Sequence, residues 1–175
     1  LTVSEVEANN VIKVYYVKDN FNYTVEYYYD GEKDTTKTDT IEATYQDVIS
    51  TYTDKNITGY KLEKTENLPL TVSEVEANNV IKVYYVKRTD LSYTVNYLEK
   101  GTTNVLHEQK VVGNQTYGTV IKSSDEEITI DGYDYDSADK ETLTIGTGEN
   151  VINLYYTKRT DLSYTVNYLE KGTTN

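Results

Sequence analysis

The stretch Leu70–Lys87 reads LTVSEVEANNVIKVYYVK, and Leu1–Lys18 carries the same letters in the same order. A second exact repeat relates Lys87–Asn104, KRTDLSYTVNYLEKGTTN, to Lys158–Asn175. In both cases the copies lie about 70 residues apart, and identity over such lengths indicates duplication within the chain. A unit of that size can fold alone, although it buries too little surface to be very stable.

The stretches between the exact copies are less similar but still align. The residues Tyr23–Tyr27, for example, match Tyr93–Tyr97. This alignment divides the chain into complete and partial repeats. The predicted segments are 1–18, the C-terminal fragment of a preceding repeat; 19–87, repeat unit 1; 88–158, repeat unit 2; and 159–175, the N-terminal fragment of a following repeat.

The composition favours strands around a tyrosine-rich core. The chain has 175 residues, of which 20 are Tyr, with one Phe and no Trp, Met or Cys. The other apolar residues are mainly Val and Ile, whose branched side chains suit strands better than helices. Tyrosine combines a large apolar ring with a polar hydroxyl, so it suits small domains whose core side chains still reach water.

Alternating apolar residues predict the strands of each unit. Tyr93, Val95 and Tyr97 share one face of an opening strand, and a turn at Lys100–Gly101 leads to a second strand over His107–Val112. The closing strand of each unit should bury alternate side chains, which are Ile81, Val83 and Tyr85 in one copy and Ile152, Leu154 and Tyr156 in the other.

One segment predicts a short helix. Thr44 is followed three residues later by Asp47, which makes a short capping box, and an apolar pair follows at Val48–Ile49. The second copy has Thr119 in place of Asp47, so its helix should be weaker or shorter. These apolar pairs, with Val120–Ile121 in the second copy, should pack on the closing strands. A hairpin, a short helix and further strands together predict an α+β, strand-rich fold.

Charge and composition exclude several classes of function. The net charge is −12 and no basic cluster stands out, so nucleic acid is a poor partner. No apolar run approaches the ~20 residues that span a bilayer, so no membrane partner is expected. The chain lacks cysteine, and its single histidine, His107, has no recognisable nucleophile nearby. We therefore expect neither an enzyme nor a bound cofactor.

Four carboxylates in one short stretch are the best candidates for a metal site. Hard oxygen ligands at this density can bind calcium, but their spacing does not fit an EF-hand. Side chains that alternate along a strand also cannot all converge on one ion. The first copy has Lys61 and Leu62 in the aligned stretch, so a solvated acidic strand and loop is preferred and no metal is favoured. The four calcium candidates are Asp131, Asp134, Asp136 and Asp139.

Most tyrosines are expected in the core, because alternation turns them inward. A few should instead lie on the outer surface, where a flat ring that is apolar on its face and polar at its tip can stack on a sugar. The candidate ligand-binding residues are Tyr28, Tyr84 and Tyr155.

Several short motifs resemble a known family. The sequence Tyr-Thr-Val-Asn-Tyr-Leu-Glu at 93–99, the Gly132–Tyr133 step and the closing Asn150–Thr157, NVINLYYT, are similar to the mucin-binding (MucBP-type) repeats of Gram-positive cell-surface adhesins. The resemblance covers about 19–158 and implies tandem ubiquitin-like β-grasp units arranged end to end. It also implies an extracellular, cell-wall-anchored protein that attaches to mucus glycoproteins and has no catalytic residues.

Two functions are compatible with these features. The first is an adhesin repeat that binds host mucin, or glycans of another glycoprotein, weakly per copy and gains avidity through repetition. The second is a passive stalk, whose repeats contact neighbouring repeats of the same chain and project a distal binding domain from the cell wall. Outward rings grouped on one face in both units favour binding, whereas a charged and featureless surface favours the stalk.

Each terminal fragment carries one strand of a unit without its partner. An unpaired strand is unstable in water, and its edge recruits another strand. We therefore expect the head fragment of one chain to pair with the tail fragment of a neighbour, or either fragment to pair with a free edge in its own chain. The apolar faces that such pairing would cover are Ile12, Val14 and Tyr16 at one end and Tyr164, Val166 and Tyr168 at the other.

Overall fold

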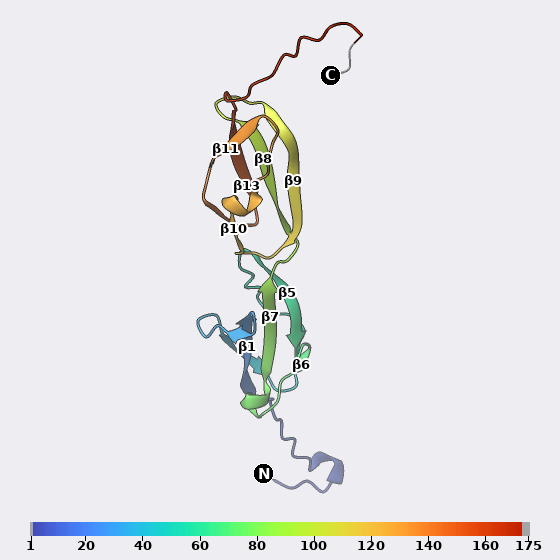
Figure 1. The fold of residues 1–175 in the computed structure, drawn as a ribbon. Coiled ribbons are helices and arrows are strands. Elements are labelled where there is room, and N and C mark those ends of the chain that lie inside the picture. The colour runs from blue at the N-terminus through green and yellow to red at the C-terminus, as the bar shows by residue number, and fades with distance from the viewer. Residues whose placement is uncertain (1, 173–175) are drawn as a thin grey trace. The chain divides into compact units, whose positions relative to one another are not determined.

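The computed structural model describes residues 2–172 of the chain. These residues fall into two compact units (Figure 1). The first takes in residues 2–56 and 62–86, and the second residues 57–61 and 87–172. Strands dominate both units. Helical structure in the described residues is limited to three 3-10 segments, which are η1 (Glu7–Asn9), η2 (Glu76–Asn78) and η3 (Ser123–Glu126).

The first unit is built around one larger sheet. Its strands are β1 (Asn20–Tyr29), β2 (Glu32–Lys33), β3 (Asp39–Thr44), β4 (Val48–Ile49), β5 (Tyr60–Glu66), β6 (Leu70–Thr71) and β7 (Val80–Lys87). The sheet has the order β2-β1-β7-β5, and β3 also pairs with β1. Strands β4 and β6 pair antiparallel as a separate two-stranded sheet.

The second unit has the same plan. Its strands are β8 (Leu91–Glu99), β9 (Val105–Gln115), β10 (Val120–Lys122), β11 (Tyr133–Ala138), β12 (Thr142–Thr144) and β13 (Val151–Lys158). The main sheet has the order β11-β13-β8-β9, and β10 pairs with β12. The predicted opening hairpin is confirmed, because β8 and β9 pair antiparallel around a turn at Lys100–Gly101.

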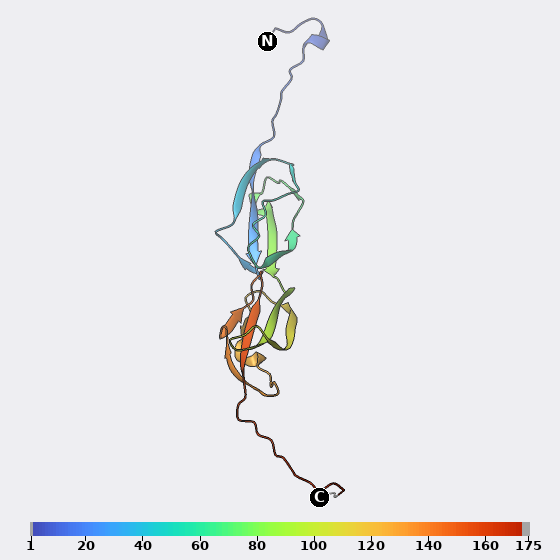
Figure 2. The same ribbon diagram turned by 90° about the horizontal axis from the view of Figure 1, so that it is seen from above.

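The opening and closing strands of each unit lie side by side and run parallel. In the first unit the register runs from Thr24 opposite Val80 to Tyr29 opposite Tyr85. In the second unit β8 and β13 pair in the same way over six residue pairs. Both views show β1 beside β7 (Figures 1 and 2). This parallel pair is the centre of each unit.

Burial confirms the predicted faces of the closing strands. Every one of the six predicted side chains is at most 1 % exposed, so burial on the closing strands alternates as expected. The predicted packing of Val48–Ile49 and Val120–Ile121 on the closing strands is right only in part. Ile49 and Ile121 are half-buried, but Val48 and Val120 are 62 % and 57 % exposed, so the prediction that both members of each pair pack inward is wrong.

The predicted α+β fold is wrong, and with it the helix-bearing ubiquitin-like β-grasp unit. The described residues form almost entirely β-structure, with no α-helix among them. Where the capping box predicted a helix, Val48–Ile49 forms β4 and pairs with Leu70–Thr71. The weaker helix expected after Thr119 is likewise a strand, β10, which pairs with β12.

The residues of the capping box form a turn instead of a helix N-terminus. The Asp47 N–H donates to the Thr44 carbonyl at 3.0 Å, and the Asp47 carboxylate accepts the Thr44 N–H at 3.2 Å. Gln46 within this turn has φ 69°, and the aligned Gly118 has φ 81°. A left-handed residue ends any right-handed helical path. The branched Val48–Ile49 pair that follows then extends as a strand.

Tyrosine hydroxyls hold the segment that replaces the helix. In the first unit the Tyr27 hydroxyl donates to the Thr53 carbonyl at 2.6 Å, and the Lys55 N–H donates to the Tyr85 hydroxyl at 3.3 Å. In the second unit the Ile128 N–H donates to the hydroxyl of Tyr156 at 3.1 Å. A helix satisfies its own backbone, but an extended segment without a strand partner does not. The core tyrosines therefore supply the hydrogen-bond partners that this extended backbone lacks. Phenylalanine has no hydroxyl and could not do so.

One buried asparagine in each unit ties the closing strand to the opening strand. Asn79 is fully buried; its amide Nδ2 donates to the Asn22 and Ser73 carbonyls at 3.1 and 2.7 Å, and its Oδ1 accepts the Ser73 N–H at 2.9 Å. We call this arrangement the asparagine clasp. In the second unit Asn150 makes the equivalent bonds to Ser92 and Gly146.

The terminal fragments are extended and exposed. Within the described part of the chain, residues 10–19 and 159–172 belong to no strand. Tyr16 is 91 % exposed and Tyr168 is 94 % exposed. Pairing with a free edge in the same chain is therefore wrong, while pairing with a second chain stays a prediction.

Residues 2–172 contain no helix long and apolar enough to cross a bilayer.

Candidate functional site

The outer face of the first unit brings two predicted residues together. Alternation buries one side of β1 and β7 and turns Tyr28 and Tyr84 to the other side. These two residues face each other across the strand pair. Their rings stack with centroids 4.7 Å apart and planes 22° apart. The sequence placed both rings on the outer face, and the strand register makes them neighbours.

Both faces of the Tyr84 ring are already covered. The Lys64 ammonium lies 4.6 Å from the centroid of the Tyr84 ring. Since β1 and β5 flank β7 on opposite sides, Tyr28 and Lys64 cover opposite faces of Tyr84. Stacking on aromatic faces is how a sugar or a cation would bind here. A sugar could reach only the edge of Tyr84 without displacing one of its neighbours.

Two carboxylates complete this arrangement, which we call the tyrosine ladder. Glu26 accepts the Tyr28 hydroxyl at 2.7 Å and the Lys33 ammonium at 2.5 Å. On the other side, Glu66 accepts the Tyr84 hydroxyl at 3.0 Å and the Lys64 ammonium at 2.6 Å. Polar tips and charges are thus satisfied within the sheet. The tyrosine ladder consists of Glu26, Tyr28, Lys33, Lys64, Glu66 and Tyr84.

These contacts shift the pKa values of the two tyrosines and of Glu66. The hydrogen bond to Glu26 raises the pKa of Tyr28 to about 12, with burial as a further cause. Burial also raises the pKa of Tyr84, and the hydrogen bond to Glu66 adds to it. Hydrogen bonds from Lys64 and Tyr84 lower the pKa of Glu66. These shifts keep the rings neutral and the carboxylate charged near neutral pH, so the ladder offers no general acid or base poised for proton transfer.

The outer face of the second unit lacks this ladder. The third predicted residue, Tyr155, lies opposite Leu98 rather than opposite another ring. Beside it, Asn96 donates to Asn153 at 2.9 Å across the same strand pair. The stacked pair of the first unit is therefore not repeated at Tyr155.

The four predicted calcium ligands have separate partners. Asp136 pairs with Lys100 at 2.6 Å, and Asp134 lies 3.9 Å from Arg159. Asp139 accepts the Asn153 backbone N–H at 2.9 Å, while Asp131 is exposed in the turn before β11. Residues 2–172 contain no group of three or more acidic, histidine or cysteine side chains that could hold a metal ion.

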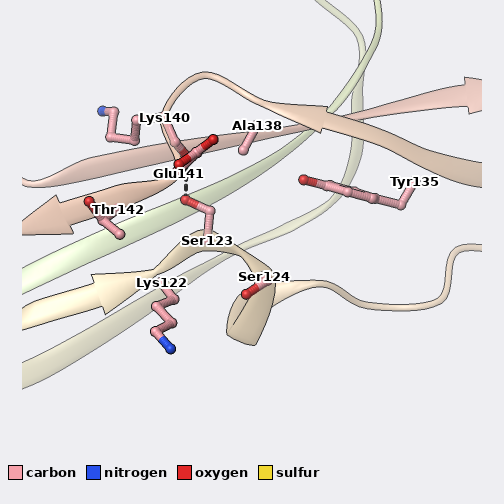
Figure 3. A pocket seen from close by; sticks show the side chains of 8 residues that line it. All are labelled: Lys122, Ser123, Ser124, Tyr135, Ala138, Lys140, Glu141 and Thr142. Atoms are coloured by element: carbon pink, nitrogen blue, oxygen red, sulfur yellow. Dashed lines mark hydrogen bonds between the residues drawn. The ribbon is translucent and has the colours of Figure 1, made fainter.

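The second unit carries a small hollow that sequence reasoning missed. Its volume is about 440 Å³, within the range of small-ligand sites. Tyr135, which is 38 % exposed, points toward it, and Ser123 donates to the Lys140 carbonyl at 2.6 Å across it (Figure 3). Exposed polar groups surround the ring. The lining residues are Lys122, Ser123, Ser124, Tyr135, Ala138, Lys140, Glu141 and Thr142.

This hollow has the chemistry of a weak polar-ligand site. Lys140 donates to the Val151 carbonyl and pairs with Asp139 at 3.1 Å, so its ammonium is already engaged. Ser124, Glu141 and Thr142 are exposed and line the same hollow as the Tyr135 ring. One aromatic ring with hydroxyls and a carboxylate could hold a sugar, but it offers no nucleophile beside a base. His107 lies elsewhere, on β9, with its ring edge against Tyr97.

Comparison with known proteins adds no assignment. No protein-family model matches this chain, and neither does any curated protein sequence.

Proposed function

We propose that this chain is a segment of a Gram-positive cell-surface adhesin and that its two units act as spacers. They would hold a distal binding domain away from the cell wall, in an extracellular setting. The observation that carries this proposal is the difference between the outer faces. In the first unit the outer rings Tyr28 and Tyr84 stack on each other and Lys64 lies over Tyr84 as well, whereas the second unit has Leu98 at the position of Tyr28.

Other features support the spacer role. Exact repeats of 18 residues supply length without new chemistry. The net charge of −12 favours solubility of an exposed segment. The resemblance to mucin-binding repeats supports a surface location. Catalysis and a bound cofactor form no part of the proposal.

A second candidate is weak glycan binding at the hollow of the second unit. The specific observation in its favour is the exposed Tyr135 ring at a hollow that the hydroxyl-bearing residues Ser124 and Thr142 also line. Host mucin glycans would then be the partner, and repetition would supply avidity. The first unit has Leu62 on β5 at the position of Tyr135, so the ring at this hollow has no counterpart there.

The test is a binding screen of the whole chain against immobilised mucin and a glycan array. The spacer role predicts no saturable response. A saturable response that Tyr135→Ser abolishes would replace the spacer role with glycan binding at the hollow. A saturable response that survives Tyr135→Ser and is lost in Tyr84→Leu would place binding on the tyrosine ladder instead. Either response would overturn the proposal.

A further inference from the structure

Within each unit, the chain enters and leaves at opposite ends of one parallel strand pair. In the second unit β8 opens the unit at Leu91 and β13 closes it at Lys158. Because the two strands run parallel, the start of β8 lies beside the start of β13, near Thr94 and Val151. The end of β13 lies beside the end of β8, where Tyr156 faces Glu99. The same holds for β1 and β7 in the first unit.

Backbone hydrogen bonds close this pair at both ends. The Thr94 N–H donates to the Asn150 carbonyl at 2.8 Å, and the Lys100 N–H donates to the Tyr156 carbonyl at 2.9 Å. The first unit has matching bonds from Thr24 to Asn79 and from Asp30 to Tyr85, at 2.8 and 2.9 Å. In both units the acceptor at the start of the strand pair is the backbone carbonyl of the clasp asparagine, Asn79 or Asn150. In each unit, six residue pairs of the parallel strands lie between these two end bonds.

This geometry determines how the parallel strand pair resists a pulling force. A pull along the chain acts on the start of the opening strand and on the end of the closing strand, in opposite directions along the strand axis. Bonds between parallel strands are evenly spaced, so such a pull loads all of them together. A pull on two points at the same end would instead break them one after another. The bonds are the same, but the barrier to rupture differs.

We propose that the parallel opening and closing strands of each unit form a mechanical clamp, so that these units bear tension along the chain. This clamp is a property of the strand pairing alone. Its use in a stalk rests on the spacer role proposed above. The clamp consists of β1 with β7 in the first unit and of β8 with β13 in the second.

Packing protects the clamp from water on its inner side. Val95, Tyr97, Ile152 and Leu154 point from the two strands into the core and are each at most 2 % exposed. Both strands are also central, because β11 and β9 flank them. Water therefore has little access to replace a loaded bond, and the whole pair must slip before the core opens. The equivalent pair in the first unit is flanked by β2 and β5.

Single-molecule force measurements on the full chain can separate the two directions of loading. The chain contains no cysteine, so engineered thiols are unique attachment points. Thr89→Cys with Lys158→Cys places the handles at opposite ends of the β8–β13 pair. Thr103→Cys with Lys158→Cys places both handles at the same end. Thr89 and Thr103 are exposed and the second handle is shared, so the two variants load the same strand pair in different directions.

The clamp predicts a rupture force at least about twofold higher for the Thr89 variant, because six residue pairs share the load in that geometry and are broken in turn in the other. Equal forces would overturn the proposal, as would a higher force for the Thr103 variant. Equal melting temperatures of the two unloaded variants serve as the control for damage by the substitutions. Saturable glycan binding would remove the spacer role and leave the force difference unchanged, so the two failures are distinguishable.

Discussion

The two units bury matching positions and present different outer faces. Val25 and Tyr27 on β1 are as buried as Val95 and Tyr97 on β8, and the asparagine clasp occurs in both units. On the outer side, the first unit stacks Tyr28 on Tyr84 between two ion pairs. In the second unit Leu98 stands at the position of Tyr28 and Asn96 at that of Glu26, where the amide of Asn96 donates to Asn153.

This difference identifies what the fold depends on. The inner face, the clasp and the left-handed turn are the features that the two copies share despite divergence of the sequence between them. The outer face changes from a charged aromatic ladder to an apolar and amide surface on the same strands. We infer that the inner features determine the unit and that the outer face adds only to its stability. Four predictions test this division, beginning with the largest expected effect.

The core residues of the closing strands should carry the largest effects. Leu154→Ala should cost about 3 kcal/mol of unfolding free energy and Val83→Ala about 2 kcal/mol, because both side chains are fully buried and each substitution leaves a cavity. Urea unfolding of the whole chain, followed by tyrosine fluorescence, measures the difference. The larger side chain should cost more, and the reverse order would show that the two cores are not equivalent.

The chain supplies its own control for this prediction. Val14 stands in the same sequence as Val83 but is 66 % exposed. Val14→Ala should therefore leave the unfolding free energy unchanged. A loss comparable to that of Val83→Ala would mean that the tail fragment is buried against another strand in solution, as the prediction of pairing between chains requires.

The asparagine clasp should come next. Asn79→Ala should cost about 2 kcal/mol, because it removes a fully buried side chain that bonds both the Ser73 N–H and the Asn22 carbonyl. Asn150→Ala should cost a similar amount in the second unit. Thermal unfolding of the full chain checks both values.

Asn10 is the matched control for the clasp. Its side chain accepts the Ser4 N–H at 2.7 Å and donates to the Ser4 carbonyl at 2.8 Å, as Asn79 does with Ser73. These groups are exposed, and no opening strand lies across from them in residues 2–172. Asn10→Ala should change stability by less than about 0.5 kcal/mol. Equal losses for Asn10→Ala and Asn79→Ala would show that the local loop, and not the tie to the opening strand, is what the clasp stabilises.

The left-handed turn should give a smaller effect of opposite sign in the two units. Gly118→Ala should cost about 1 kcal/mol, because an L-residue is strained at φ 81°. Gln46→Gly should gain about the same, because it relieves that strain in the first unit. A Cβ at Gly118 would meet nothing within 4 Å, so the cost is conformational. Gly113→Ala, also in open space but without a positive φ, should cost nothing; a loss there would contradict this explanation.

The same turn explains why the predicted helix was wrong. The capping box of Thr44 and Asp47 is a real hydrogen-bonded pair, but the pattern is shared by helix starts and by turns. Gly118, at the aligned position of the second copy, favoured the turn, because glycine is poor inside a helix and suited to a left-handed residue. The number of tyrosines was a second signal. Core hydroxyls at Tyr27 and Tyr156 satisfy an extended backbone that a helix would not expose.

The candidate surface was predictable only in part. Alternation predicts that Tyr28 and Tyr84 point away from the core, and in the structure they do. Their stacking depends on the parallel register of β1 and β7, and the cover by Lys64 depends on β5 lying next to β7. Neither follows from local sequence. The hollow beside Tyr135 depends on a bulge between Tyr135 and Ser137, which shifts the alternation on which strand prediction relies.

The smallest expected effects concern the outer face, where the units can be exchanged. Tyr28→Leu in the first unit should lose about 0.5–1 kcal/mol, because it removes one ring of a stacked pair and the hydrogen bond to Glu26. Leu98→Tyr in the second unit should gain about 0.5 kcal/mol, because it sets a ring opposite Tyr155. Urea unfolding measures both, and the folded spectrum should be retained in each case.

The pH dependence of the stabilisation by the Tyr28 hydroxyl sharpens this last prediction. The folded pKa of Tyr28 is raised to about 12 by its hydrogen bond to Glu26. An unfolded tyrosine ionises near pH 10. Above about pH 10 the unfolded chain therefore binds fewer protons than the folded chain, so the stabilising effect of this hydroxyl is complete below about pH 10 and is lost as the pH rises toward about 12. The difference in unfolding free energy between the unsubstituted chain and Tyr28→Phe should be constant from pH 7 to about 9.5 and shrink above it. Glu26→Gln supplies the control, because it keeps both rings and removes the carboxylate that accepts the Tyr28 hydroxyl. In that background the difference made by Tyr28→Phe should not follow the same course. If the differences measured with and without Glu26 fall in parallel, the ladder is not what sets the ionisation of Tyr28.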